Sequence, residues 1–321
     1  MKRALAALLA LLTLILPALA DGEVSAPGPD KFVPEIMEEY SVAEGRYAVA
    51  FRSMYDGETW LYNSDEFFKV ASVYKLPLNM YFYEMEAAGE IEPDAIVGGV
   101  QLDLAHYYSL EFSNNEISEA MLDYLGGYKE YKDLIQKYMG NAVDEVTPET
   151  ETEYYYDNAF TADMLLDILD YLYTNSDTFS EQLEHMLAAQ PDEYLESGEL
   201  DCDIAQKYGS QSYDGIPYVA VAGIVYADEP FLITILTRSS FGAAAAMGAI
   251  CDAFAEWDAE RIAPLKAAEL EAEHESELKS EREELTAAAE DAALDCLRLA
   301  SYAAPLPFPL PWDDIFDMAA K

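Results

Sequence analysis

The sequence Phe68-Lys69-Val70-Ala71-Ser72-Val73-Tyr74-Lys75-Leu76 holds a serine and a lysine three positions apart, directly ahead of an apolar run over 76–83. The apolar run predicts a buried helix. If that helix begins at Ser72, the hydroxyl and the amine lie on one face, one turn apart. Unpaired backbone N–H groups and the helix dipole favour negative charge at this end of a helix. Ser72 is therefore a candidate nucleophile that Lys75, rather than a histidine, would activate.

The same residues fit a second interpretation, in which Ser72 is an ordinary helix N-cap and Lys75 is a solvated surface lysine. A four-residue pattern with two fixed positions also arises often by chance. The decision between nucleophile and cap depends on which other residues the chain brings to this helix.

Strand-like runs stand at both ends of the surrounding region, and helix-like runs fill its middle. Strands are predicted at 46–52, 59–63, 204–208, 218–226 and 231–237. Helices are predicted at 116–124, 128–139, 161–173, 179–189 and 241–257, the last capped by Ser239 or Ser240. This order predicts an α/β (α+β) fold, in which about five antiparallel strands carry an inserted all-α subdomain at about 92–200.

The ends of the chain differ in character from this domain. Residues 1–20 have a basic start, a short apolar core and a small-residue cleavage site, which predicts a signal peptide. The mature protein is then expected to be exported, either secreted or associated with the cell envelope, without a stable membrane span. Residues 21–44 are predicted to be a linker, 45–258 the folded domain, and 259–321 an acidic helical and proline-rich tail. Pro264 is expected to interrupt the helical pattern there.

Composition excludes several classes of partner and site. A formal net charge of −44 over 321 residues excludes nucleic acid as a partner and disfavours anionic membranes. The three cysteines, Cys202, Cys251 and Cys296, argue against a disulfide framework, although one pair remains open. No metal-ligand spacing occurs, so neither a metal nor a cofactor is expected.

Two further motifs follow the serine in order. Ser113-Asn114-Asn115 precedes a predicted helix, and Lys207-Tyr208-Gly209 lies on a predicted strand. Together with Ser72 and Lys75 they give the order S-x-x-K, S-x-N, K-x-G. This order resembles the penicillin-recognising serine enzymes, and specifically the class A β-lactamase-like family. The resemblance covers about residues 45–258, and it implies the antiparallel sheet and helical subdomain of that family.

The resemblance implies a role for each motif residue. Ser72 would be acylated, and Lys75 would take or relay its proton. Ser113 would pass a proton to the leaving nitrogen, and Asn115 would contact the amide side chain of the substrate. Lys207 would hold Ser113 and the substrate carboxylate electrostatically.

The same resemblance predicts the substrate-facing strand. The backbone N–H groups of Ser72 and Ser210 would form the oxyanion hole. Gly209 would leave room for a substrate lying against the strand. Tyr208 replaces the usual threonine or serine, so its ring should either point to the opposite face of the sheet or narrow the cleft.

The loop that carries the deacylating carboxylate departs from the family pattern. The usual Glu-x-x-Leu-Asn is absent, and Glu153 is the candidate base, with Glu149 and Glu151 as rivals. All three also fit solvated loop carboxylates. The loop lacks the arginine that usually latches it, and Lys75 and Lys207 are expected to be the main cations of the site. Acidic neighbours should raise the pKa of Lys75, and Lys207 should lower it.

Three functions remain open at this point. The first is a secreted serine hydrolase that opens a β-lactam or a related amide. The second is a D-Ala-D-Ala-type peptidase or penicillin-binding protein acting on peptidoglycan-type peptides, with slow deacylation. The third is a non-hydrolysing cell-envelope binding module that retains the scaffold. The helix expected in the tail is a candidate site for a coiled-coil partner.

Overall fold

The computed structural model describes residues 27–143, 146–189, 191, 193–196 and 199–302. The predicted signal peptide and the proline-rich end of the tail lie outside these residues. The chain separates into two compact units between Ile262 and Ala263. Within the described ranges, no helix is both long enough and apolar enough to cross a membrane.

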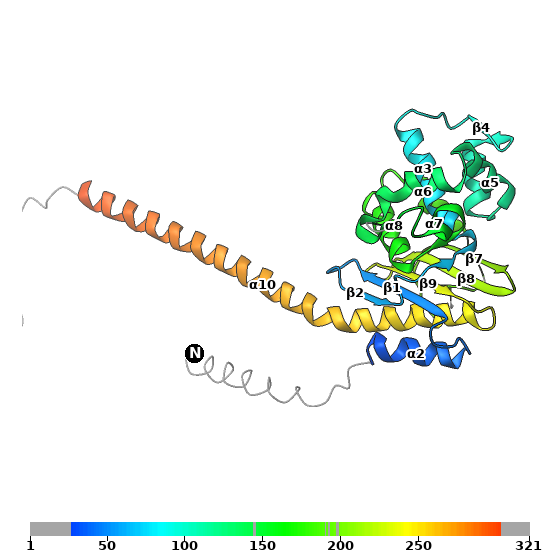
Figure 1. Ribbon diagram of the computed structural model, residues 1–321. Coiled ribbons are helices and arrows are strands. Elements are labelled where there is room, and N and C mark those ends of the chain that lie inside the picture. Colours follow the sequence, from blue (N-terminus) through cyan, green and yellow to red (C-terminus); the bar gives the residue numbers. More distant parts are fainter. Residues whose placement is uncertain (1–26, 144–145, 190, 192, 197–198, 303–321) are drawn as a thin grey trace, which may run out of the picture. The chain divides into compact units, whose positions relative to one another are not determined.

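The centre of the first unit is a five-stranded antiparallel sheet with the order β2-β1-β9-β8-β7 (Figure 1). Its strands are β1 (Tyr47–Ser53), β2 (Thr59–Tyr62), β7 (Ile204–Tyr213), β8 (Ile216–Val225) and β9 (Phe231–Thr237). Strand β1 pairs with β9 from Tyr47↔Thr237 to Ser53↔Phe231. The two ends of the domain therefore meet in one sheet, as the sequence predicts.

Strand β7 is longer than the sequence predicts. It continues to Tyr213 and turns into β8 through Asp214 and Gly215, whose φ angles are 50° and 77°. Two successive residues with positive φ are typical of a tight hairpin turn, and an Asp-Gly pair suits it. The K-x-G motif thus lies in the middle of a long edge strand.

Helices cover both faces of the sheet (Figure 1). One face holds α2 (Pro29–Glu39) and residues 243–262 of α10 (Ala243–Tyr302). Phe32 and Val33 of α2 are buried in this layer, where the rings of Phe51 and Phe254 stack 4.4 Å apart. Residues 29–39 therefore belong to the domain, whereas the sequence interpretation placed them in a linker.

The other face carries the helical region and two short ladders. Its helices are α3 (Lys75–Ala87), α4 (Leu102–Leu110), α5 (Asn115–Tyr124), α6 (Tyr128–Ile135), α7 (Thr152–Tyr156), α8 (Ala162–Thr174) and α9 (Ser180–Ala188). The ladders pair β3 (Phe68–Lys69) with β6 (Ala159–Phe160), and β4 (Ile96–Val97) with β5 (Val100–Gln101). Thr161 caps α8 as predicted, because its hydroxyl accepts from the Met164 N–H at 3.1 Å.

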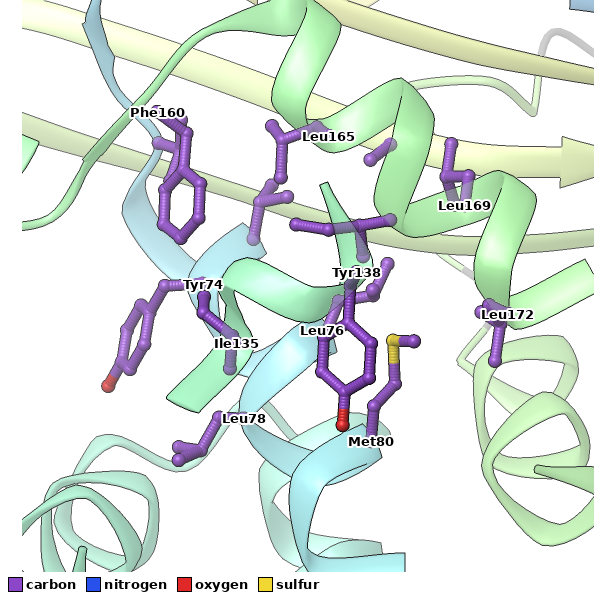
Figure 2. Packing of buried hydrophobic residues seen from close by; sticks show 14 of the residues in the cluster. Tyr74, Leu76, Leu78, Met80, Ile135, Tyr138, Phe160, Leu165, Leu169 and Leu172 are labelled. Carbon is purple, nitrogen blue, oxygen red and sulfur yellow. The ribbon is translucent and has the colours of Figure 1, made fainter. Parts of the chain in front are cut away.

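Leucines on α8 and apolar residues of α3 belong to one buried cluster. Figure 2 labels Leu165, Leu169 and Leu172 of α8 together with Leu76 and Met80 of α3. All five are fully buried, and burial of each such side chain stabilises the fold by about 1.5–3 kcal/mol. The turn that carries Ser72 contacts β7 and β8, and α3 contacts α4, α6 and α9.

Two predicted helix boundaries were wrong. Helix α10 begins at Ala243 rather than after a serine cap, and it continues through Pro264. Gly242 precedes it with φ 67°, and a Cβ there would lie 2.4 Å from the Tyr40 carbonyl oxygen, so only glycine fits. Proline removes one backbone hydrogen bond to the residue four positions earlier, and α10 tolerates that loss.

The second unit is described only by the part of α10 that begins at Ala263. Its leucines, including Leu270, Leu278 and Leu285, are exposed. A partner for this helix stays a prediction. The three cysteines are all described, and all are free thiols.

Candidate active site

Ser72 lies in a short 3₁₀ helix, Ala71–Tyr74, and α3 begins at Lys75. The prediction that Ser72 starts an α-helix was therefore wrong in detail. Side chains three residues apart eclipse each other in a 3₁₀ helix, so Ser72 and Lys75 still share a side. Val70, and not Ser72, occupies the N-cap position of this turn. The interpretation of Ser72 as a capping serine is thereby excluded.

The serine turn is held in a strained backbone. Ala71 has φ 48°, an uncommon conformation for a residue with a Cβ. Such residues cost of order 1–3 kcal/mol and persist where the surroundings hold them. Here the Asn158 side chain donates to the Ala71 carbonyl at 2.7 Å, and the Val70 N–H donates to the Asn158 carbonyl at 3.1 Å. The segment after α7 thus fixes the position of Ser72.

Lys75 brings the first two motifs together. Its fully buried Nζ donates to the Ser113 carbonyl at 2.6 Å, to Ser113 Oγ at 3.2 Å and to Asn115 Oδ1 at 2.7 Å. Among the residues that the structure describes, these are its hydrogen-bond acceptors, and Ser72 Oγ is not one of them. Lys75 is therefore one turn from the nucleophile and in direct contact with the predicted proton shuttle.

The S-x-N motif forms the start of α5. Asn114 is the N-cap, and its side chain accepts from the Ile117 N–H at 2.9 Å. The middle residue of the motif therefore stabilises the first turn of α5. Ser113 has φ 51°, so a second site residue is held in the left-handed region.

Burial has the largest effect on the pKa of both predicted site lysines. It lowers the pKa of Lys75 to about 8, against the smaller opposing effect of the Glu119 carboxylate. It also lowers the pKa of Lys207 to about 7, and the Lys75 ammonium adds to that shift. The sequence interpretation gave most weight to acidic neighbours, because burial of these amines could not be judged from the sequence. A buried lysine of this kind can act as a general base near neutral pH.

Strand β7 places the third motif beside the serine. Lys207 is fully buried and its Nζ donates to the Leu110 carbonyl at 3.1 Å, three residues before Ser113. A Cβ on Gly209 would lie 2.5 Å from the Ser72 backbone nitrogen. Gly209 is therefore required by the serine turn itself, a reason different from the predicted clearance for substrate. The exposed Ser210 follows directly, where the oxyanion hole is predicted.

Tyr208 points to the opposite face of the sheet from Lys207 and Gly209. It packs against the layer that contains α2 and α10, and its ring centroid lies 4.5 Å from that of Tyr194. The strand alternation that turns Lys207 inward turns Tyr208 away. Of the two predicted outcomes for this ring, the structure shows the one that leaves the cleft open.

Glu153, the predicted deacylation base, faces a lysine that the sequence interpretation missed. Its Oε2 lies 3.6 Å from Nζ of Lys69, and its side chain is 70% exposed. Asp157 is closer to the same amine, at 2.6 Å. Lys69 is only 4% exposed, and its Nζ lies 4.8 Å from the centre of the Tyr213 ring. Lys69 thus latches the α7 loop, which lacks an arginine.

A second buried lysine was also missed. Lys132 of α6 is fully buried, donates to the Ala159 carbonyl at 2.8 Å, and lies 3.2 Å from the centre of the Phe160 ring. Burial lowers its pKa well below the ordinary value. Lysines on helices are usually solvated, so no sequence signal distinguished Lys132. Lys69 had one signal, its place on a strand directly before the serine.

Comparison with known proteins identifies the fold. Residues 30–100 match the beta-lactamase enzyme family. No curated protein sequence matches the chain. A solved beta-lactamase from Chitinophaga pinensis DSM 2588 is 22% identical, with a TM-score of 0.59, and the match covers 72% of this chain and 98% of that one.

Two further solved structures match over a similar extent. A beta lactamase from Xanthomonas campestris pv. campestris str. ATCC 33913 is 15% identical with a TM-score of 0.59, covering 71% of this chain and 98% of that one. The TLA-3 extended-spectrum beta-lactamase is 17% identical with a TM-score of 0.59, covering 72% and 98%. At these identities the likeness establishes the fold, and the predicted fold class is confirmed.

Proposed function

We propose that this chain is a serine hydrolase that opens a β-lactam or a related amide through an acyl-enzyme on Ser72. The chain resembles class A β-lactamases in fold, and residues 30–100 match the beta-lactamase enzyme family. The observation that carries the proposal is the position of Lys75. Its amine joins Ser113 and Asn115, one turn after Ser72, while Gly209 of β7 closes against the Ser72 backbone.

Acylation would use these groups in sequence. Neutral Lys75 takes the proton of Ser72 Oγ as the oxygen attacks the substrate carbonyl. The backbone N–H groups of Ser72 and Ser210 stabilise the oxyanion that forms. Lys75 returns a proton through Ser113 Oγ, 3.2 Å from its Nζ, to the leaving nitrogen. The carbon–nitrogen bond then breaks, and the acyl group stays on Ser72.

Local cations favour an anionic substrate. The protein carries a formal net charge of −44, which repels anions at long range. Lys75 and Lys207 lie close enough for their charges to interact. Burial disfavours the charged form of Lys207, and a bound carboxylate would stabilise that charge. A β-lactam carboxylate or a peptide C-terminus would bind to charged Lys207, while neutral Lys75 acts as the base. The predicted export of the protein agrees with such substrates. Determining the N-terminal sequence of the mature protein, purified from a cell-envelope or culture fraction, tests the predicted export.

Hydrolysis of a chromogenic β-lactam by purified variants tests the proposal. Wild-type protein should turn the substrate over. Ser72→Ala should lose activity by a factor on the order of 10³ or more, and Lys75→Met should do the same while remaining folded. Ser240→Ala, which removes an exposed serine far along the chain, is the matched control and should be unaffected. Wild-type rates in Ser72→Ala would contradict the mechanism.

A further inference from the structure

Release of the acyl group needs a base that activates water, and three carboxylates are candidates for that role. They are Glu119 of α5, and Glu153 and Asp157 of the α7 loop. The question rests on the proposed function, because it arises only if Ser72 is acylated. Each carboxylate must be free to accept a proton and must face the serine through water.

The two carboxylates of the α7 loop are occupied. Both oxygens of Asp157 accept hydrogen bonds, Oδ2 from Lys69 Nζ at 2.6 Å and Oδ1 from the Asn158 N–H at 2.6 Å. Glu153 lies 3.6 Å from the same ammonium. Both groups therefore pair with the Lys69 ammonium, which compensates their negative charge. Hydrogen bonds and the Lys69 ammonium thus occupy these carboxylates, whereas a general base needs an oxygen that is free to bind water.

Glu119 lies on the helix face that is turned toward Lys75. Helix α5 is capped by Asn114 and begins at Asn115, whose Oδ1 accepts from Lys75 Nζ at 2.7 Å. Residues four apart on a helix are neighbours on one face. Glu119 therefore lies one turn after Asn115 on the same face of α5. Its side chain is exposed, so water reaches it. It has no hydrogen-bond or ion-pair partner within the described part of the chain.

The electrostatic effects of Glu119 agree with that position. Burial lowers the pKa of Lys75, and the charge of Glu119 opposes that shift. Burial raises the pKa of Tyr74 and of Tyr128, and Glu119 adds to both shifts, after Tyr128 for Tyr74 and after Asp157 for Tyr128. Tyr74 belongs to the serine turn and Tyr128 begins α6, and their ring centroids lie 6.0 Å apart. The Glu119 carboxylate thus lies near groups from three elements that meet at the site.

We propose that Glu119 is the general base for hydrolysis of the Ser72 acyl-enzyme, in place of a carboxylate on the α7 loop. Glu119 takes a proton from water as the water oxygen bonds to the acyl carbon. The tetrahedral intermediate collapses, and the bond between that carbon and Ser72 Oγ breaks. The proton passes from Glu119, directly or through Lys75, to Ser72 Oγ, and the product leaves as a carboxylic acid.

Burst kinetics with a chromogenic β-lactam, combined with intact mass measurement, test this assignment. Glu119→Gln keeps the size of the side chain and removes the base. Its first turnover should stay within about threefold of wild type, while steady-state turnover falls roughly 10²- to 10⁴-fold and the acyl adduct accumulates on Ser72. Glu116→Gln, an exposed substitution on the same helix, is the matched control and should behave as wild type.

Two results would overturn the assignment. One is wild-type deacylation in Glu119→Gln, and the other is an equal loss of the burst and the steady state. Glu153→Gln is the rival variant, and selective accumulation of the adduct there would return the role to the α7 loop. If wild-type protein forms no adduct on Ser72 at all, the proposed function itself fails, and the two failures are thereby distinguished.

Discussion

Gly209 shows how a single residue sets the position of the nucleophile. A Cβ at this position would lie 2.5 Å from the Ser72 nitrogen and 3.0 Å from its Cβ. Gly209→Ala should therefore displace the serine turn. A misplacement on the order of 1 Å costs roughly 100-fold in rate, so the acylation rate constant from the burst phase should fall by about that factor.

Gly223→Ala is the control for this experiment, because it also adds a Cβ to a glycine within a sheet strand. Its new atom would lie 2.6 Å from Cδ1 of the buried Leu195 and 3.1 Å from the Ala205 carbonyl oxygen and from Gln206 Cβ, and Ser72 is not among these contacts. Gly223→Ala should lower stability and leave acylation per folded molecule unchanged. Wild-type acylation in Gly209→Ala would show that the close approach to Ser72 is unimportant.

The two site lysines predict a bell-shaped pH profile for kcat/KM. Lys75 acts as a base only when neutral, so its contribution grows as pH rises through its pKa of about 8. Lys207 attracts an anionic substrate only when charged, so its contribution falls as pH rises through its pKa of about 7. The maximum should lie between these two values, and the apparent pKa values belong to the coupled pair.

Substrate binding should change this profile in one direction. A bound carboxylate raises the pKa of Lys207, so kcat should persist to higher pH than kcat/KM does. Measurement of kcat and kcat/KM from pH 5 to pH 10 checks this. A folding measurement at the two ends of this range confirms that the protein stays folded. A kcat/KM that rises steadily above about pH 9 would contradict a charged Lys207 in substrate binding.

At the scale of elements, Lys69 connects β3 to the α7 loop. Lys69→Met keeps the apolar stem and removes the ammonium that holds Asp157 and Glu153. Loss of this largely buried pairing should lower the free energy of unfolding by about 1–3 kcal/mol. Backbone amides of 152–157 should exchange hydrogen faster, because the loop loses its latch.

Lys129→Met provides the matched comparison. Lys129 forms an exposed pair with Asp133 of the same helix, and solvent screens such pairs, so its loss should change stability little. Urea unfolding and hydrogen exchange of both variants separate the two cases. Equal, small effects of the two substitutions would show that Lys69 is not a latch.

Elements that are set by neighbouring residues in the sequence can be predicted from it, whereas elements that are set by contacts in space cannot. Strand runs bounded by turn residues predicted the five-stranded sheet. The spacing of Ser72 and Lys75 predicted that they share a side, and the resemblance to the class A β-lactamase-like family implied that Ser113 joins them. Helix α2 carries charges and an internal proline, and its place in the domain comes from burial against the sheet. The burial of Lys69 and Lys132 likewise depends on contacts with elements that are distant in the sequence. A pattern of neighbouring residues carries no information about those contacts.

At the scale of the whole molecule, the net charge of −44 should slow the approach of anionic substrates. Raising ionic strength from 0.01 M to 0.15 M shortens the screening length from about 30 Å to about 8 Å. The kcat/KM for an anionic β-lactam should therefore rise, whereas that for a neutral ester should stay nearly constant. Stopped-flow measurement with both substrates checks this, and an equal salt response of the two would exclude long-range repulsion as the cause.

The most direct test of the account is the mass of the protein after brief exposure to a β-lactam, followed by peptide mapping. Ser72 should gain the full mass of the opened lactam within the burst phase, and the adduct should be absent from Ser72→Ala. Persistence of the adduct for longer in Glu119→Gln than in wild type would support the release step as well. An adduct on another residue, or turnover without any dependence on Ser72, would contradict the central claim.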